Sequence, residues 1–599
     1  MAGFVGFVAA TGRTGQPGLV SETLARLLPG EGRPVERIVR EELGLGVGWT
    51  AEAVDGPRAR MIANAGGDVC LVFVGENFHD FGAGTAGFDP SDLRPVLAAY
   101  EREGRTALER INGWFSGVLI DARAGRVLVF NDRYGLSRIY VHEAPAGFYF
   151  ASRPAPLLGA LPALRSLDVR GLGEWFACGC SLQNRTLFTA VTLLPAGSVW
   201  SFHAGGRRTR ERLFEPSVWE TQAALSPAEY EEALRALFPR VLRRYLQGSQ
   251  PVGMSITGGL DGRMIMAWAG AAAGTLPCYT FNGPYHPCQD LQLGRRIAAA
   301  CGQPHRVIDV GNDFLAQFPA LAARTVEVSG GTMDVSGAVE VYVNRIARDV
   351  APIRLTGNYG SELLRGNVAF RPSELPADWL TPELTAAVQA AGRTYASERQ
   401  GDALSFIAFK QVPWHHHARL SVEQSQLTVR SPFLDNDLVG LAFRAPAAVR
   451  TAVEPSLRLI EAGQPALTRI PTDRGLVYPP TRLTQLRRAW EEFWIKVEYG
   501  MDYGMPAWFA RTAGPWLGRG LERRFLGRQK FYHFRTWYRR ELAPFVREVL
   551  LDARSRSRPW YRPGAVERMV EAHTQGRGNH TREIHRMLTL ELLERQLTA

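Results

Sequence analysis

The stretch Met254-Ser255-Ile256-Thr257-Gly258-Gly259-Leu260-Asp261-Gly262-Arg263-Met264-Ile265-Met266 decides the fold of this chain. The apolar run that ends at Ile256 predicts a buried strand, and the spacing of apolar residues after Met264 predicts a helix. The glycines of the turn let backbone N–H groups approach an anion, and the helix start adds unpaired N–H groups and a positive dipole end. The stretch therefore predicts a phosphate-binding loop between a strand and a helix.

Asp261 makes this prediction more specific. Phosphate alone would repel a carboxylate, so Asp261 implies a bridging cation, for which Mg²⁺ is the expected ion. No Gly-Lys-Ser/Thr follows the glycines, which excludes a Walker A loop. The turn resembles the Ser-Gly-Gly-x-Asp-Ser pyrophosphate loop of the ATP-pyrophosphatase enzymes: Thr257 keeps the first hydroxyl, and Gly262 replaces the last serine. A glycine-rich strand–helix turn without a ligand is the alternative interpretation.

Strand and helix patterns alternate after this loop, which predicts a parallel sheet with helices on both faces. Strands are expected at 278–282, 305–310 and 352–356, and helices at 290–301 and 339–350. Ligands of such sheets bind at the carboxyl ends of the strands. We therefore expect ATP at this edge, in contact with Ser255, Thr257, Gly258, Gly259, Leu260, Asp261, Gly262, Phe281, Thr356 and Gly357.

The first third of the chain, to about residue 203, is β-rich. Strands are expected at 4–9, 69–74, 115–120, 127–130, 139–142, 147–151 and 198–202, with a helix near 172–176. The segment 12–48 is expected to hold one helix between loops, and 204–227 to be a linker. Ser226 and Glu229 form a capping-box pattern that should start a helix reaching Leu246.

Several motifs in this part follow one another as in the glutaminase domain of asparagine synthetase: Ile111-Asn112-Gly113-Trp114-Phe115, Asn131-Asp132-Arg133-Tyr134-Gly135-Leu136, Phe150-Ala151-Ser152, Arg185-Thr186-Leu187-Phe188 and Leu194-Pro195-Ala196-Gly197. The resemblance implies a two-domain chain of α/β and α+β class. Residues 1–210 would form a class II glutamine amidotransferase-like domain, an αββα sandwich of the N-terminal-nucleophile hydrolase type. Residues 225–599 would form a parallel-sheet ATP-pyrophosphatase domain, similar to the adenine-nucleotide α-hydrolases.

Glutaminase activity is not expected from the first domain. Enzymes of that family use a cysteine after the initiator Met as nucleophile, beside a free α-amine. This chain has Ala2 there, and the family's glutamine-binding Asn-Gly-Glu is reduced to Gly75-Glu76 after Val74. An engineered change at Ala2 is conceivable, but the loss at Val74 favours a natural absence. The domain is therefore expected to be a retained scaffold.

A second loop, Leu355-Thr356-Gly357-Asn358-Tyr359-Gly360-Ser361-Glu362-Leu363-Leu364-Arg365-Gly366, resembles the Ser-Gly-Glu-Gly-Ala-Asp-Glu loop of asparagine synthetases. Matched from the right, Glu362 takes the place of the Mg²⁺-binding aspartate, and Tyr359 that of the residue handling the nucleophile. Matched from the left, Ser361 and Asn358 take those places. We prefer the first match, because it keeps a carboxylate opposite Asp261. A glycine-rich turn with a solvated glutamate is the remaining alternative.

Two later segments extend the resemblance. Arg430-Ser431-Pro432-Phe433-Leu434-Asp435 resembles Arg-x-Pro-Phe-Leu-Asp of the synthetase domain, with Asp435 expected to cap the next helix. Thr428 stands where the family often has a glutamate, so a Tyr–Glu catalytic pair is doubtful, although Glu423 is near in sequence. Asparagine synthetases carry a lysine near here that contacts phosphates, and this chain has Arg474 instead. The guanidinium of Arg474 can bind phosphate bidentately.

The resemblance gives no counterpart for two further segments. The aromatic and basic insertion at about 478–540 is expected to be an amphipathic helical segment that buries its aromatics, with a substrate-recognition lobe as the alternative. The run His415-His416-His417 is expected to be a polar loop rather than a metal site.

Composition limits the partners. The net charge of +11 is carried by dispersed arginines without a nucleic-acid-binding module, so we do not expect nucleic acid as a partner. No apolar run is long enough to span a membrane, and the start lacks a basic signal-peptide region, so a cytoplasmic protein is expected. The six cysteines show no metal spacing and are expected to be reduced core residues.

The resemblances imply a two-step reaction with ATP and Mg²⁺. A substrate carboxylate attacks the α-phosphate and gives an acyl-adenylate and pyrophosphate, and a nitrogen nucleophile then displaces AMP. Because Ala2 cannot release ammonia from glutamine, we expect an amine carried on a substrate, as in β-lactam synthetases and lasso-peptide cyclases. The acid would be a small molecule, a peptide or a glycan, and the chain could form a homodimer. The alternatives are an asparagine synthase using free ammonia and a non-catalytic homologue that binds nucleotide or a partner.

Overall fold

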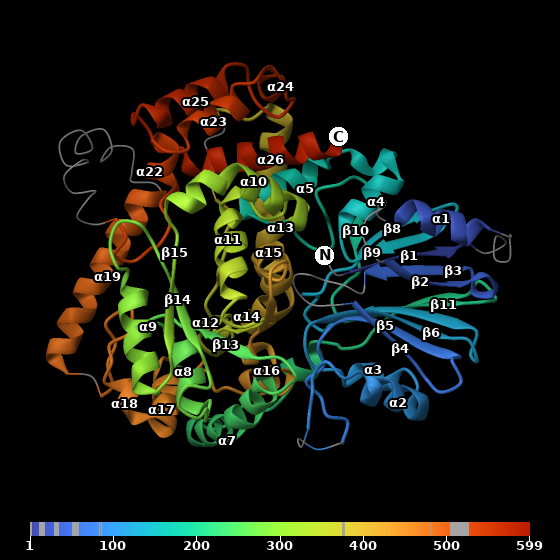
Figure 1. Cartoon of the computed structure of the whole chain (residues 1–599), viewed down its shortest axis with the longest axis horizontal. Helices are drawn as coiled ribbons and strands as arrows, with labels where there is room; N and C mark the ends of the chain where they lie inside the picture. The colour runs from blue at the N-terminus through green and yellow to red at the C-terminus, as the bar shows by residue number, and fades with distance from the viewer. Residues whose placement is uncertain are drawn as a thin grey trace.

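The computed structural model describes residues 3–10, 18–28, 35–50, 59–82, 84, 87–373, 378–479, 481–503 and 526–598. Ala2, and the sequence prediction that rests on it, lies outside these residues. Antiparallel sheets fill the half of the molecule that holds the N-terminal third of the chain, and a parallel sheet surrounded by helices fills the other half (Figure 1).

The N-terminal domain is a sandwich of two six-stranded antiparallel sheets. The first sheet has the order β10 (Thr192–Leu193), β8 (Tyr140–Ala144), β9 (Gly147–Ala151), β1 (Phe4–Ala9), β3 (Leu45–Thr50), β2 (Val35–Arg40). The second has the order β12 (Arg208–Arg212), β11 (Ser198–His203), β7 (Arg126–Asn131), β6 (Phe115–Asp121), β5 (Val69–Gly75), β4 (Ala59–Ala63).

Buried residues of both sheets share one core, among them Val8, Val47, Val72 and Val118. Helices α1 (Leu19–Leu27) and α4 (Pro154–Ala160) cover the first sheet, and α2 (Arg94–Glu103) and α3 (Thr106–Glu109) lie outside the second (Figure 1). These layers confirm the predicted αββα sandwich.

Five strands of this domain were not predicted: β2, β3, β4, β10 and β12. The segment 12–48 holds α1 as expected, but it also holds β2 and begins β3, and the expected linker holds β12. Strands β2 and β12 lie at sheet edges, where one side is open to solvent and polar side chains are favoured. Their sequences VERIVR and RTRER therefore lack the apolar alternation that indicates a strand.

The C-terminal domain is built on a five-stranded parallel sheet, as predicted. Its order is β15 (His305–Asp309), β14 (Cys278–Asn282), β13 (Val252–Ser255), β16 (Ile353–Leu355), β17 (Thr428–Arg430). The chain leaves the central strand β13 toward β14 and later returns to its other side as β16. The loops after β13 and β16 therefore meet at the topological switch point, where such sheets open a crevice.

Helices surround this sheet. The capping box at Ser226 starts α7 (Pro227–Leu246) as predicted, α8 (Leu260–Trp268), α9 (Gln289–Ala300) and α10 (Asn312–Ser329) follow strands, and α11 (Ala338–Ala347) precedes β16. Also described in this part are α6 (Ser217–Glu220), α12 (Gly360–Arg365), α13 (Pro382–Glu398), α14 (Ala403–Phe406), α15 (His417–Glu423), α16 (Asn436–Phe443), α17 (Glu454–Gly463), α18 (Pro465–Thr468) and α19 (Arg482–Tyr503), and α5 (Val169–Cys178) of the N-terminal domain packs against α13. Asp435 caps α16, accepting the N–H of Asp437, as predicted.

The run His415-His416-His417 is not a polar loop, and that prediction was wrong. It ends a π-helix, η4 (Ile407–His416), and starts α15. Pro413 lies inside the π-helix and lacks the N–H that an α-helical turn would need, so a wider turn is tolerated there. All three histidine side chains are half-buried.

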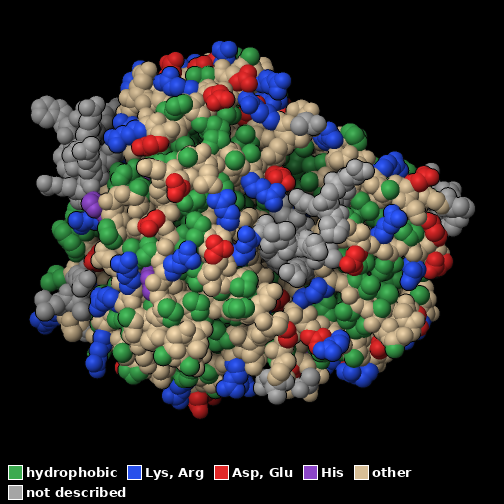
Figure 2. Space-filling model, in the orientation of Figure 1, with side chains coloured by type: hydrophobic (Ala, Val, Ile, Leu, Met, Phe, Trp, Pro, Cys, Tyr) green, Lys and Arg blue, Asp and Glu red, His purple; other side chains and the backbone are tan. Residues whose placement is uncertain are grey.

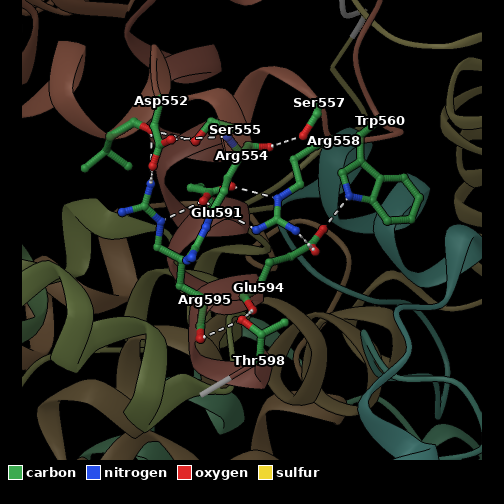
Figure 3. A network of polar contacts seen from close by, with 11 residues as sticks. Asp552, Arg554, Ser555, Ser557, Arg558, Trp560, Glu591, Glu594, Arg595 and Thr598 are labelled. Carbon is green, nitrogen blue, oxygen red and sulfur yellow. Dashed lines mark hydrogen bonds and ion pairs between the residues drawn. The ribbon is translucent and has the colours of Figure 1, made fainter.

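The C-terminal helices form one cap on the domain: α22 (Phe534–Arg539), α23 (Ala543–Leu550), α24 (Ala553–Arg556), α25 (Ala565–Thr574) and α26 (Thr581–Thr598). Arg558 donates to Glu591 (2.9 Å) and Glu594 (2.6 Å) on α26. Arg595 donates to Glu591 (2.7 Å) and Asp552 (2.9 Å). Figure 3 shows how these alternating charges join α26 to the segment before α24 and after it.

Two general predictions can be compared with the described residues. The six cysteines are all free, and five of them are buried. Within the described ranges, no helix combines the length and apolarity that a membrane span requires. On the face in Figure 2, Lys and Arg side chains are interspersed with Asp and Glu.

Candidate functional site

A cavity of about 420 Å³ lies at the switch point, between the ends of β13, β14 and β16. Most residues predicted to bind ATP or Mg²⁺ line it: Ser255, Thr257, Gly259, Asp261, Gly262, Phe281, Thr356, Gly357 and Glu362, together with Tyr359. Gly258 and Leu260 belong to the same loop but are not part of the lining. The structure thus brings together residues that are about a hundred positions apart in the chain.

The two loops touch each other through glycines. A Cβ at Gly357 would lie 2.6 Å from the backbone nitrogen of Gly262, and one at Gly360 would lie 2.5 Å from the carboxyl carbon of Asp261. Neither neighbour can move without moving the loop. Only glycine therefore allows the second loop to pack against the first.

Arg263 holds the first loop from behind. Its guanidinium donates to the carbonyls of Gly258 (3.0 Å), Leu467 (3.0 Å) and Pro471 (3.1 Å), and also to that of Ile470. The side chain is buried, and burial lowers its pKa to about 10. Arg263 thereby fixes the segment 467–471 against the loop.

Two loop amides already have partners. The N–H of Gly258 donates to Oδ1 of Asp290 at 2.8 Å, and Asp290 also lines the cavity. Burial raises the pKa of Asp290 to about 6, and the N–H bond of Gly258 opposes that rise. The N–H of Gly259 donates to the Thr257 hydroxyl at 3.4 Å, so both contacts set the shape of the loop.

Asp261 lies at the centre of the site. Its Oδ1 is 2.6 Å from Nη2 of Arg365, while the residue also lines the cavity. Burial raises the pKa of Asp261 to about 6, Arg365 opposes the rise, and the nearby Glu362 adds to it. Glu362 accepts from Ser361 at 2.8 Å and lies 3.6 Å from Nε2 of His416.

These two carboxylates fit a Mg²⁺ ion. Mg²⁺ usually takes one or two protein carboxylates and completes its shell with phosphate oxygens and water. Asp261 and Glu362 line one cavity and supply that number. Across the ranges that the structure describes, no group of three or more His, Cys, Asp or Glu residues is placed to hold a metal. The donor set therefore suits a metal shared with a ligand rather than an all-protein cage.

Tyr359 has an unusual backbone conformation. Its φ is +73°, in the left-handed region that costs a residue with a Cβ roughly 1–2 kcal/mol. Its side chain is buried, with ring contacts to Trp114 (centroids 5.7 Å apart) and His416 (5.3 Å). Burial raises the pKa of Tyr359 well above its ordinary value, and Glu423 adds to that rise. Such strain is typical of functional sites.

The far wall of the cavity carries charged residues that the sequence predictions did not include. Arg354, on β16, donates to Ser255 (3.1 Å) and lies 3.3 Å from Glu423. Glu423 also accepts from Arg419 at 3.0 Å. Glu423 was named only as a sequence neighbour of Thr428, yet it lines the same cavity as Tyr359. A single arginine in the middle of an otherwise apolar strand was the one available signal for Arg354.

Residues 529–532 of the predicted insertion also line the cavity. Lys530 is 3% exposed, and its loop is held by Glu498 of α19, which accepts the N–H groups of Gly527 (3.0 Å) and Gln529 (2.7 Å). Lys530 is one of three lysines in the chain, a scarcity that could have singled it out. Part of the insertion thus belongs to the site.

Arg474 lies elsewhere. It is exposed and is not part of the cavity lining, although its neighbour Asp473 donates its N–H to the carbonyl of Gly258 at 3.2 Å. The contact of Arg474 with phosphate stays a prediction, and Lys530 is better placed for that role.

Comparisons with known proteins agree with this arrangement. A family model described as asparagine synthase matches residues 233–456 and 517–595, and one described as a glutamine amidotransferase domain matches residues 61–213. An asparagine synthetase [glutamine-hydrolyzing] of Triphysaria versicolor is 25% identical over 390 residues, which cover 62% of this chain and 56% of that protein. Asparagine synthetase [glutamine-hydrolyzing] 2 of Bacillus subtilis is 24% identical over 307 residues, 48% of this chain and 41% of that protein.

The chain therefore spans about half the length of the curated relatives it matches. Among solved structures, the glutamine phosphoribosylpyrophosphate amidotransferase from B. subtilis, complexed with ADP and GMP, matches 76% of this chain and 92% of its own. Its sequence identity is 11% and the TM-score is 0.24.

Proposed function

Since the chain belongs to the asparagine synthase family, we propose that it is an ATP-dependent ligase that adenylates a substrate carboxylate and joins it to an amine. The observation that carries this proposal is the cavity at the switch point. It combines a glycine-rich loop, the carboxylates of Asp261 and Glu362, the cation Lys530 and the strained Tyr359 within one enclosed space.

In the first step, a carboxylate oxygen of the acid attacks the α-phosphorus of ATP. The bond from the α-phosphorus to the bridging oxygen breaks, and pyrophosphate leaves with the bonding electrons. The loop N–H groups, the Thr257 hydroxyl and Lys530 are the donors that would stabilise this leaving group. Asp261 and Glu362 would hold Mg²⁺, which neutralises phosphate charge when bound.

In the second step, the amine attacks the acyl carbon, AMP leaves, and the nitrogen loses a proton. Tyr359 is the residue proposed to position the amine. The ion pair Arg354–Glu423 forms the cavity wall beside Tyr359, and it keeps the buried carboxylate of Glu423 within the cavity. The enclosed wall would keep water from competing for the activated acid.

The nitrogen source is proposed to be a substrate amine. The sequence has Ala2 where the glutaminase nucleophile would stand. Glu76, retained from the family's glutamine-binding motif, is engaged by Arg430 in two hydrogen bonds of 2.6 and 2.8 Å. Both observations support a domain that no longer hydrolyses glutamine.

Pyrophosphate exchange into ATP tests the first step. The protein is incubated with ATP, Mg²⁺, labelled pyrophosphate and a panel of amino acids and other carboxylic acids that begins with L-aspartate. We expect exchange with at least one acid and its loss, by on the order of a hundredfold or more, in Asp261→Asn. Asp313→Asn, an exposed aspartate on α10, is the matched control.

Absence of exchange with every acid would favour the non-catalytic homologue. Exchange that survives Asp261→Asn unchanged would remove Asp261 from the site. Once an acid is known, AMP release with ammonium alone would favour an ammonia-using asparagine synthase over a ligase for a larger amine.

A further inference from the structure

The N-terminal domain contacts Tyr359, a residue that lines the cavity of the C-terminal domain, through Trp114. The Trp114 ring stands edge-on to Tyr359, with centroids 5.7 Å apart and planes at 85°. Such an edge-to-face pair stabilises the two rings beyond the area that they bury. Trp114 thus helps to hold Tyr359 in its left-handed backbone conformation.

The segment that precedes Trp114 is hydrogen-bonded to the C-terminal domain. Asn112 donates to Oδ2 of Asp435 at 2.7 Å and accepts the N–H of Asn436 at 3.0 Å. The side chain of Asn436 donates to the carbonyl of Ile111 at 3.2 Å. These groups are buried, so breaking them would leave polar atoms without partners. The position of Trp114 is therefore set by the domain interface.

Gly113 makes the approach possible. Its φ is +132°, and a Cβ there would lie 2.5 Å from the carbonyl oxygen of Glu76. A residue with a side chain could not turn the backbone at this point without displacing the Glu76 strand end. The turn directs the chain from Asn112 into β6 with Trp114 at the interface.

The N-terminal domain also fixes the other ring that contacts Tyr359. His416 lies at the end of the π-helix, with its ring 5.3 Å from that of Tyr359. Arg138 donates to the carbonyl of Trp414 at 3.3 Å and to that of Pro413. The ring of His417 bonds to the carbonyl of Leu136 at 2.9 Å. Both ring neighbours of Tyr359 thus depend on contacts with the N-terminal domain.

The space between the two domains beside Trp114 is nearly filled. Phe78 of the N-terminal domain stacks on Tyr245 of α7 with centroids 3.9 Å apart. Glu76 pairs with Arg430, and the cavity that remains among these residues and Trp114 is about 20 Å³. Such a volume holds roughly one water molecule. The two domains are therefore in direct contact in this part of the interface.

We propose that the N-terminal domain serves the ligase reaction as a brace, in which Trp114 is the positioning residue that holds Tyr359 in place for the amine step. The inference rests on the proposed function, which assigns the amine to Tyr359. It explains why a domain without its nucleophile is retained: Tyr359, which lines the C-terminal cavity, packs against Trp114 of that domain. Adenylation depends on the loops around Asp261 and does not require this contact.

Three variants test the brace. Trp114→Ala removes the ring contact, and Trp114→Phe keeps an aromatic edge. Trp200→Ala is the matched control, because Trp200 is a similarly sized ring of the same domain that packs on Phe148 in β9 instead. Each variant is assayed for pyrophosphate exchange, and for AMP release with ammonium and methylamine as probe amines, using the acid that supports exchange in the parent protein.

For Trp114→Ala we expect exchange and the KM for ATP to stay within about twofold, while amine-dependent AMP release falls on the order of tenfold to a hundredfold. Trp114→Phe should recover most of the loss, and Trp200→Ala should change neither assay. A third readout needs no substrate: in protein labelled with 3-fluorotyrosine, the ¹⁹F resonance that disappears in Tyr359→Phe should shift in Trp114→Ala and not in Trp200→Ala.

Three outcomes in Trp114→Ala would overturn the inference: an unmoved Tyr359 resonance, equal losses of exchange and amine capture, or unchanged amine capture. If the parent protein shows no exchange with any acid, the proposed function fails instead, and the resonance alone then decides whether Trp114 holds Tyr359.

Discussion

Lys530 is, with Arg354, one of the buried cations of the site, and its neighbourhood explains why it matters. It lines the cavity, is 3% exposed, and sits on a loop whose backbone is held by Glu498. A lysine in an enclosed site acts as a strong point charge because little water screens it. At the scale of single residues, this position is the sharpest test of the phosphate end of the cavity.

We expect Lys530→Ala to lower pyrophosphate exchange on the order of a hundredfold to a thousandfold, because a preorganised donor to the leaving group is lost. Lys530→Arg should retain part of the rate, since the charge is kept but its geometry changes. Lys496→Ala, an exposed lysine of α19, is the control. Equal rates in Lys530→Ala and the parent protein would place the phosphates elsewhere.

Helix α19 and the loop that follows it act together at the scale of elements. The helix was expected to bury its aromatics, but Trp490 and Phe493 are more than half exposed, and that prediction was wrong for these residues. Its role in the site comes from its other end, where the buried Glu498 accepts backbone N–H groups from residues 527, 529 and 530. The alternative prediction, substrate recognition, stays a prediction.

Replacing Glu498 by Gln should loosen the cavity wall. The amide keeps one acceptor and turns the other into a donor that faces an N–H, so one hydrogen bond to a charged group is lost. We expect the KM for ATP to rise on the order of threefold to tenfold, equivalent to about 1 kcal/mol. Glu492→Gln, whose parent carboxylate pairs with Arg488 on the surface of the same helix, should leave the KM unchanged. A KM unchanged in both variants would contradict the assignment.

The ion pair Glu76–Arg430 joins the two domains at the scale of the whole molecule. Arg430 is 2% exposed and also donates to the carbonyls of Tyr245 (2.9 Å) and Gln247 (2.8 Å). Removing one partner of a buried pair is costly because the other charge is left uncompensated. Residues that are 354 positions apart in the chain thus depend on each other.

Glu76→Ala should therefore lower the free energy of unfolding by about 3–5 kcal/mol. Urea unfolding of the variant measures it, with Glu143→Ala as the control, because the pair Glu143–Arg210 is exposed. A loss below that of the control would show that Arg430 is satisfied by the two carbonyls alone.

The molecule should also be sensitive to acid through His573. This side chain is fully buried between the carbonyl of Arg535 and the N–H of His580, and burial lowers its pKa to about 3. The unfolded chain would bind the proton near pH 6.5, so its stabilising contribution is present above that pH and is lost as the pH falls toward 3. At pH 5 the loss is about 2 kcal/mol.

His573→Gln keeps a donor and an acceptor but cannot be protonated. Between pH 7 and pH 5 its free energy of unfolding should fall less than that of the parent protein, by about 2 kcal/mol. Thermal and urea unfolding across this range measure the difference. Parallel pH dependences of the two proteins would show that His573 is charged in the folded state.

The sequence by itself determined the two-domain architecture and the centre of the site. A strand–glycine turn–helix stretch around Asp261, capping boxes and apolar periodicity are local patterns, because they depend on residues only a few positions apart. Together with the resemblance to asparagine synthetases, they predicted the parallel sheet, the sandwich and ten of the 24 described residues that line the cavity. Edge strands such as β12 were not predicted, because solvent contact favours polar side chains there and removes the apolar alternation that indicates a strand.

Only the tertiary structure decided which distant side chains complete the cavity. Arg354, Glu423 and Lys530 enter it from a strand, a helix end and a loop, and Trp114 reaches Tyr359 from another domain. The wall of a cavity is set by the packing of whole elements, and no short-range pattern encodes which of their side chains will face one another. The sequence named the loop that we propose to hold the phosphates, and packing chose the groups that surround it.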